Sequence, residues 1–172
     1  MNQSDLVRTE VEALVETVQV KTHFKTARGV ARAVDGVSIQ IRRGQSLGIV
    51  GESGSGKTVL SRSIMGLLPR NGVIRQGSVR YQGQEISEHT PKEMRSIWGR
   101  EMAMIFQDPM TSLNPVMKVG KQITESLRMH LGMSATEAMA VAEKLFRDVR
   151  IPEPTRRLNQ YPHELSGGMR QR

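Results

Sequence analysis

The stretch Gly51-Glu52-Ser53-Gly54-Ser55-Gly56-Lys57-Thr58 matches the pattern G-x-x-x-x-G-K-[ST] at every fixed position. The preceding residues, 45–50, are mostly apolar and predict a short buried strand. The following residues, 58–67, predict a helix that ends before Pro69. A strand, a glycine-rich loop and a helix in this order are typical of a phosphate-binding loop in an α/β fold.

Each residue type in this loop has a chemical reason to be there. Successive backbone N–H groups can form a concave nest for phosphate oxygens, and the N-terminus of the following helix strengthens it. Glycine allows backbone angles and a close approach that a side chain would obstruct. Lys57 can reach the β- and γ-phosphates, and the Thr58 hydroxyl can bind Mg²⁺. The predicted nucleotide site comprises Gly51, Glu52, Ser53, Gly54, Ser55, Gly56, Lys57 and Thr58.

Composition narrows the class of protein. The chain has 172 residues, of which 37% are hydrophobic and 24% charged, so we expect a globular fold. It contains no cysteine, which excludes disulfides and thiolate metal sites. The net charge of +8 is spread without a block of five like charges, and only 3% of residues are aromatic. We therefore expect no nucleic-acid partner. We also expect neither a secretory signal nor a membrane-spanning segment.

Strand patterns dominate the first part of the chain. Residues 14–24 are rich in Val and Thr, and residues 37–42 alternate between apolar and polar side chains. Residues 78–86 predict a short hairpin, and residues 101–106 another apolar strand. A capping box at residues 90–93 predicts a short helix that reaches Trp98.

Helical patterns follow Asn114-Pro115. Apolar residues at a spacing of four predict a helix from Val119 that ends at Gly132. A second capping box, at residues 134–137, opens a helix with a continuous apolar stripe that Pro152 and Pro154 terminate. We therefore predict a nucleotide-binding core over 1–113, a helical subdomain over 114–165 and the start of a further helix over 166–172.

Two later segments carry a family resemblance. Leu165-Ser166-Gly167-Gly168-Met169-Arg170-Gln171-Arg172 is similar to the signature motif of ABC transporter ATP-binding subunits, and Phe106-Gln107-Asp108-Pro109 is similar to their Q-loop. The chain thus resembles that family, whose fold is an α/β P-loop NTPase core with N-terminal antiparallel strands and a helical subdomain. The longer segments Gln107–Pro115 and Tyr161–Arg172 resemble the branch that powers oligopeptide, dipeptide and nickel importers.

The resemblance implies roles for further residues. Gln107 would ligate Mg²⁺ or its bound waters and sense the γ-phosphate of ATP, unless it is a buried or solvated glutamine without a role. Phe24 would stack on adenine, or else it is a core residue at the end of a strand. Ser166, Gly167 and Gly168 would contact ATP held by a partner subunit, so that two ATP are shared in a head-to-tail dimer. The alternative is an ordinary helix start capped by Ser166.

The resemblance also implies partners and a location. A second ABC ATPase subunit, identical or a paralogue, would complete the two sites. Two membrane-spanning permease subunits would contact the Q-loop and the helical subdomain, and an extracytoplasmic solute-binding protein would act through them. The protein would then lie peripherally on the cytoplasmic face of the membrane. The solute is not encoded in these residues, because the family places specificity in the other subunits.

In the family, the carboxylate that positions the attacking water and the switch histidine follow the signature. We therefore expect the C-terminal part of the core to be missing from this chain, and the 172 residues alone to hydrolyse ATP poorly and to expose the edge of the strand before the loop. Two alternatives to an importer ATPase stay open here. One is a soluble ABC ATPase acting on nucleic acid or the ribosome, and the other is a non-catalytic nucleotide-binding remnant.

Overall fold

The computed structural model describes residues 13–69, 71–106 and 112–172. The chain divides into two compact units, with the boundary between Ser96 and Ile97. The predicted division into a nucleotide-binding core over 1–113 and a helical subdomain over 114–165 stays a prediction. Within the described ranges, no helix combines the length and the apolar character needed to cross a bilayer.

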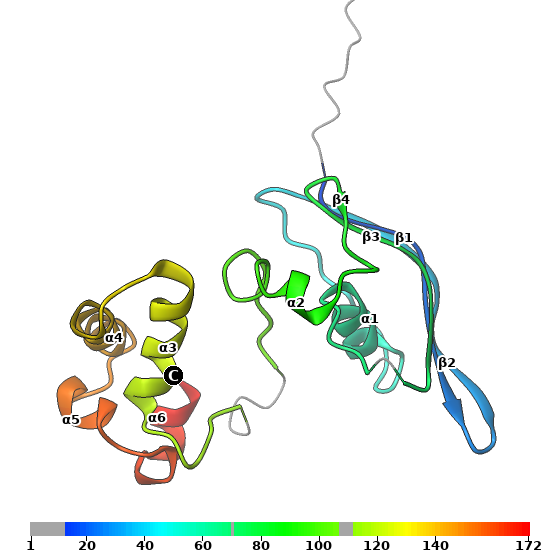
Figure 1. The fold of residues 1–172 in the computed structure, drawn as a ribbon. Helices are drawn as coiled ribbons and strands as arrows, with labels where there is room; N and C mark the ends of the chain where they lie inside the picture. The colour runs from blue at the N-terminus through cyan, green and yellow to red at the C-terminus, as the bar shows by residue number, and fades with distance from the viewer. Residues whose placement is uncertain (1–12, 70, 107–111) are drawn as a thin grey trace, which may run out of the picture. The chain divides into compact units, whose positions relative to one another are not determined.

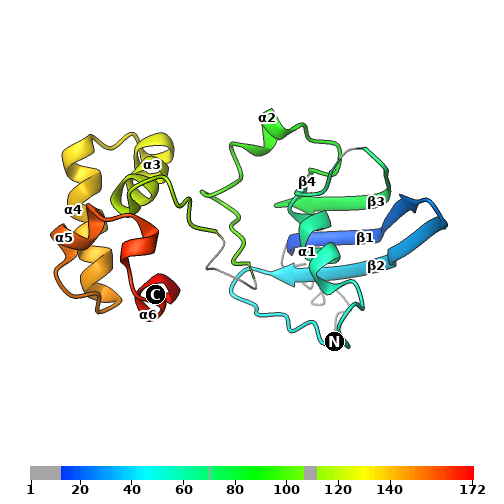
Figure 2. The same cartoon turned by 90° about the horizontal axis from the view of Figure 1, so that it is seen from below.

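The first unit is built on a four-stranded antiparallel sheet (Figures 1 and 2). Its strands, in the spatial order β2-β1-β3-β4, are β1 (Ala13–Thr26), β2 (Gly29–Arg42), β3 (Val73–Tyr81) and β4 (Gln84–Glu85). Strand β1 is the long central strand and pairs with both β2 and β3. The predicted N-terminal antiparallel strands and the hairpin over 78–86 are therefore confirmed.

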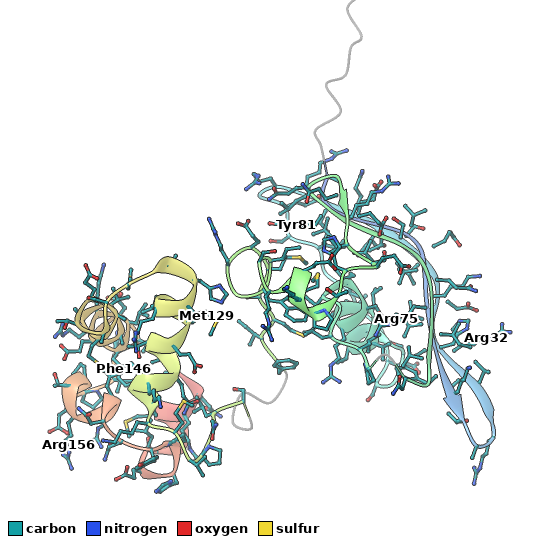
Figure 3. All side chains as sticks on the ribbon, viewed as in Figure 1. Arg32, Arg75, Tyr81, Met129, Phe146 and Arg156 are labelled. Carbon is teal, nitrogen blue, oxygen red and sulfur yellow. The ribbon has the colours of Figure 1, made fainter. Side chains whose placement is uncertain are left out.

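Helix α1 (Lys57–Ile64) lies against this sheet (Figure 2). Leu60 supplies its buried apolar contact and is 6% exposed. The Arg75 guanidinium of β3 donates to the carbonyl oxygens of Leu68 and Pro69 at 2.6 and 2.9 Å, which holds the segment after α1 to the sheet (Figure 3). Helix α2 (Pro91–Met94) begins at the predicted capping box but ends four residues before Trp98.

Two predicted strands are not formed. Residues 45–50 have no ladder hydrogen bonds, and Leu47, Ile49 and Val50 are 42%, 42% and 94% exposed. Residues 103–106 are likewise irregular, although Met102 forms a single bridge with Trp98. A buried parallel strand needs hydrogen-bonded neighbours on its flanks. The described residues supply no such neighbour to either segment, so the apolar patterns do not become strands.

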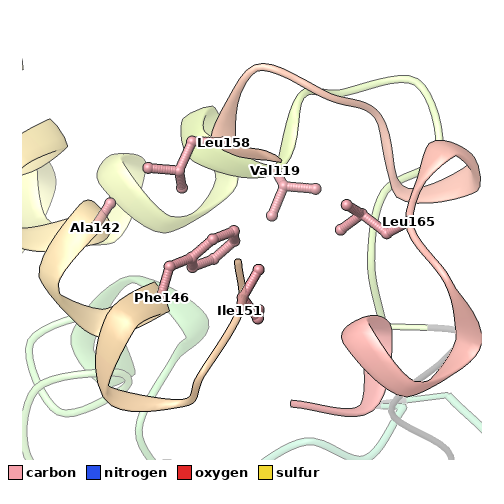
Figure 4. Close-up of a cluster of buried hydrophobic side chains, with 6 residues drawn as sticks. All are labelled: Val119, Ala142, Phe146, Ile151, Leu158 and Leu165. Atoms are coloured by element: carbon pink, nitrogen blue, oxygen red, sulfur yellow. The ribbon is translucent and has the colours of Figure 1, made fainter. Parts of the chain in front are cut away.

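The second unit is helical: α3 (Val119–Leu131), α4 (Ala135–Asp148), α5 (Pro154–Leu158), the 3-10 helix η2 (Pro162–Glu164) and α6 (Gly167–Gln171). Gly132 ends α3 in a left-handed conformation, and Ser134 opens α4 with a capping box, as predicted. Helices α3, α4 and α5 and the segments that follow α4 and η2 contribute buried apolar side chains to one core, and Met169 of α6 packs against it (Figure 4). Its members are Val119, Ala142, Phe146, Ile151, Leu158 and Leu165.

A carboxylate network closes the β3–β4 hairpin. Both Ser78 and Ser87 donate hydroxyl hydrogen bonds to Glu85, and the backbone N–H groups of Val79 and Ser87 donate to the same carboxylate at 3.1 Å. Burial by itself raises the pKa of Glu85. The four hydrogen bonds outweigh it and lower the pKa from 4.5 to about 2, because they favour the ionised form.

Replacing this carboxylate should therefore destabilise the fold in a pH-dependent way. Because Glu85 is mostly solvent-screened, Glu85→Gln should lower the free energy of unfolding by only about 0.5–1 kcal/mol at pH 7. The depressed pKa belongs to the folded state, so the contribution is complete above pH 4.5 and is lost as pH falls toward 2. Urea unfolding at pH 7 and pH 3 measures this, with the exposed Glu88→Gln as control. A difference that stays constant between the two pH values would contradict the prediction.

Candidate nucleotide site

The loop after residue 50 is shaped by left-handed glycines. Gly54 and Gly56 have φ values of +83° and +89°, which side chains rarely adopt. The Ser55 N–H donates to the Glu52 carbonyl at 3.2 Å, which turns the chain. A Cβ on Gly51 would lie 2.8 Å from Ser55 Oγ, and one on Gly54 would meet open space. Residues 51–55 are exposed, so their backbone is accessible to an anion.

The Lys57 side chain folds back across this loop. Its ammonium donates to the carbonyl oxygens of Gly51 and Glu52 at 2.7 and 2.6 Å, and to Ser55 Oγ at 3.2 Å. A positive charge is therefore held against the loop by groups that carry no net charge. That arrangement fits a phosphate group, because the ammonium can exchange its carbonyl contacts for phosphate oxygens.

The N-terminus of α1 completes the anion-binding geometry. Gly56 is the N-cap residue and provides no side-chain hydrogen bond, and the first turn contains no acidic residue. The first N–H groups of the helix are thus not capped by a side chain, and the partial positive charge at this end is not offset. Thr58 is exposed in the same turn, where its hydroxyl is available to a cation bound beside a phosphate.

A β-bulge in β2 positions the start of α1. Thr22 of β1 pairs with Val34 and His23 pairs with Arg32, so Ala33 is the extra residue on β2. A Cβ built on Gly56 would lie 2.1 Å from the Ala33 carbonyl oxygen, which means that the two backbones are in direct contact. The motif predicts a glycine here but gives no hint of the strand that requires it, because nothing in the alternation of residues 30–34 marks a bulge.

Phe24 lies on the strand beside this contact. It pairs with Ala31 and Val73, and it is half-buried. The β1–β3 register is regular from Thr22 to Phe24, so these two side chains occupy the same face of the sheet. Thr22 hydrogen-bonds to Ser63 of α1, which identifies that face as the one that α1 covers. Phe24 and the phosphate loop thus belong to the same side of the first unit, and its stacking on adenine stays a prediction.

Gln107, the predicted Mg²⁺ ligand of the Q-loop, lies outside the described residues. Its neighbour Phe106 is described and is 43% exposed. The role assigned to Gln107 therefore stays a prediction.

The signature segment lies in the second unit. Ser166 is the N-cap of α6, and its Oγ accepts a hydrogen bond from the Met169 N–H at 3.3 Å. Leu165, which is 5% exposed, anchors the segment in the helical core. A Cβ on Gly167 or Gly168 would meet nothing within 4 Å. The capping role of Ser166 is thus present, and the two glycines expose bare backbone next to it.

Sequence comparison places these features in a family. A family model described as "ABC transporter" matches residues 34–172. The oligopeptide transport ATP-binding protein OppD of Bacillus subtilis is 48% identical over 163 residues, which cover 94% of this chain and 46% of OppD. The dipeptide transport ATP-binding protein DppD of Escherichia coli K12 is 45% identical over 160 residues, which cover 93% of this chain and 49% of DppD. The chain spans about half the length of these curated relatives.

Structural comparison gives the same fold. The ATP-binding cassette MJ0796, solved as a dimer in a post-hydrolysis state bound to ADP and Pi, has a TM-score of 0.75 and 24% identity. A second dimeric structure of MJ0796 has a TM-score of 0.74 and 22% identity. Each match covers 91% of this chain and 65% of that one. The α/β fold of an ABC ATPase, which the family resemblance implies, is therefore confirmed.

The two left-handed glycines allow strain and collision to be separated. Gly54→Ala should cost about 1–2 kcal/mol of stability, because an alanine is strained at this φ but meets open space. Gly56→Ala should cost more than Gly54→Ala, because it adds a collision with the Ala33 carbonyl to a similar strain. Urea unfolding of both variants measures the difference. Equal losses of stability would show that the contact with β2 does not constrain Gly56.

Proposed function

The chain belongs to the ABC transporter family, and from this premise we propose that the whole protein is the ATP-hydrolysing subunit of an importer for peptides. The observation that carries the proposal is the 43–48% identity, over more than nine-tenths of this chain, to relatives named as oligopeptide and dipeptide transport ATP-binding proteins. A related solute such as nickel stays within the same branch. The choice of solute would lie with other subunits.

The phosphate loop would hold the β- and γ-phosphates of ATP. Lys57 would supply the positive charge, since its ammonium already lies on the carbonyl oxygens of the loop, and backbone N–H groups of the loop would donate hydrogen bonds to phosphate oxygens. Thr58 would hold Mg²⁺, together with Gln107, and Phe24 would stack on the adenine. Mg²⁺ would neutralise charge on the phosphates when bound. Phosphoryl transfer depends on such positioning and charge stabilisation, so these residues act by orienting ATP.

Ser166, Gly167 and Gly168 would act on ATP bound to a second ATPase subunit. Their exposed hydroxyl and bare backbone at the start of α6 are consistent with contact to an anion on a partner. ATP would then close a head-to-tail dimer, identical or of two paralogues, and hydrolysis would reopen it. Two permease subunits would receive this motion through the Q-loop and the helical subdomain, at the cytoplasmic face of the membrane. An extracytoplasmic binding protein would deliver the solute.

Removing the loop ammonium tests nucleotide binding directly. In the full-length protein, Lys57→Ala should weaken MgATP binding by about 100-fold, because it removes charged hydrogen bonds to phosphate. Titration calorimetry measures the dissociation constant, and Lys92→Ala on α2 is the matched control, expected to bind as the wild type does. Unchanged affinity in Lys57→Ala would refute the assignment of the loop.

A charge at the signature tests the shared site. Gly168→Asp should leave MgATP binding by the isolated full-length subunit unchanged, since the side chain enters open space. It should lower ATP turnover of the complete transporter by about 100-fold or more, because a carboxylate would face phosphate across the dimer. Turnover and ATP-dependent dimer formation are both measured. ATP turnover equal to that of the wild type would refute the proposed contact between the signature segment and ATP on the partner subunit.

A further inference from the structure

A pair of hydroxyl groups joins α1 to the centre of the sheet. Thr22 Oγ1 lies 2.7 Å from Ser63 Oγ, and Ser63 Oγ donates to the Val59 carbonyl oxygen at 2.7 Å. Since the single proton of Ser63 is used on Val59, the Thr22 hydroxyl must be the donor in the first bond. The result is a directed chain of hydrogen bonds from β1, through Ser63, to the backbone of α1.

This series of hydrogen bonds is buried at its strand end. Thr22 is 0% exposed, and it is one of the largest fully buried side chains among the described residues. A buried hydroxyl needs a partner, because leaving it unpaired costs more than the net contribution of the bond itself. The pair therefore has a preferred geometry, and that geometry fixes where α1 sits along β1.

Two parts of the proposed nucleotide site lie at the ends of this connection. On the strand, Phe24 is two residues from Thr22 and shares its face. On the helix, the series of hydrogen bonds ends at the Val59 carbonyl, one residue after Thr58 and two after Lys57. The hydroxyl pair thus connects the strand that carries the adenine-stacking ring to the helix that carries the phosphate ligands.

We propose that Thr22 and Ser63 are positioning residues that set the spacing between the adenine end and the phosphate end of the ATP site. The inference rests on the proposed nucleotide site and adds two residues outside its phosphate loop. ATP engages both ends at once, so it benefits only when both are held at the right separation. Inorganic tripolyphosphate engages the phosphate loop alone, so it does not depend on that separation.

The test compares these two ligands on the full-length protein. Thr22→Val keeps the shape and removes the donor, and Ser63→Ala removes the group that accepts from it. Each should raise the dissociation constant of MgATP about fivefold, in line with the loss of one hydrogen bond. Each should leave the dissociation constant of magnesium tripolyphosphate within about twofold of the wild type. The double variant should resemble either single variant, because both act on one interaction.

Two further variants separate positioning from general damage. Thr22→Ser keeps the hydroxyl and should restore MgATP affinity. Thr17→Val is the matched control: Thr17 is a β1 threonine, 2% exposed, whose hydroxyl bonds to the Val37 carbonyl and the Ile39 N–H of β2. It should lower stability without changing the ratio of ATP to tripolyphosphate affinity.

The outcomes are distinct. A parallel loss of ATP and tripolyphosphate affinity in Thr22→Val would show a merely structural role and overturn the inference. So would MgATP affinity equal to that of the wild type. A wild-type protein that binds neither ligand would overturn the proposed function itself, and the inference with it.

Discussion

The contact between Gly56 and the carbonyl oxygen of Ala33 is the constraint on which the candidate nucleotide site depends. It brings the first turn of α1 against the backbone of β2, at the bulge formed by Ala33. Only glycine permits the approach, and only glycine is relaxed at this φ. One residue therefore satisfies the geometry of the loop and the packing of the helix on the sheet.

The rest of the first unit holds α1 in that place. Leu60 provides apolar burial, the Thr22–Ser63 pair fixes the helix on β1, and Arg75 fixes the segment that follows it on β3. The first is an apolar contact and the other two are hydrogen bonds, and all three hold α1 and the segment after it on the sheet. Their common effect is a helix N-terminus with uncapped N–H groups beside a folded-back ammonium, which is the electrostatic setting that a polyphosphate requires.

In the second unit, the signature segment, residues 165–172, exposes backbone at the start of α6. Its apolar core includes Leu165, the residue just before Ser166, so the signature segment starts from a fixed point. Beyond that point Gly167 and Gly168 carry no side chains, and no neighbouring atom fills the space that a Cβ would occupy. This exposed backbone is consistent with the contact to a partner's ATP that we propose for the signature segment.

Local patterns in the sequence were sufficient to predict many of the structural features of this protein. The phosphate loop, both capping boxes and the end of α3 at Gly132 depend on neighbours close in sequence, and each is recognisable there. The apolar runs at 45–50 and 101–106 were predicted wrongly as strands, since a strand needs hydrogen-bonded neighbours that pattern alone does not supply. Tertiary structure alone decided that Ala33 is a bulge under Gly56 and that Thr22 meets Ser63. Those contacts join residues about 20 to 40 positions apart, and no local periodicity encodes such a distance.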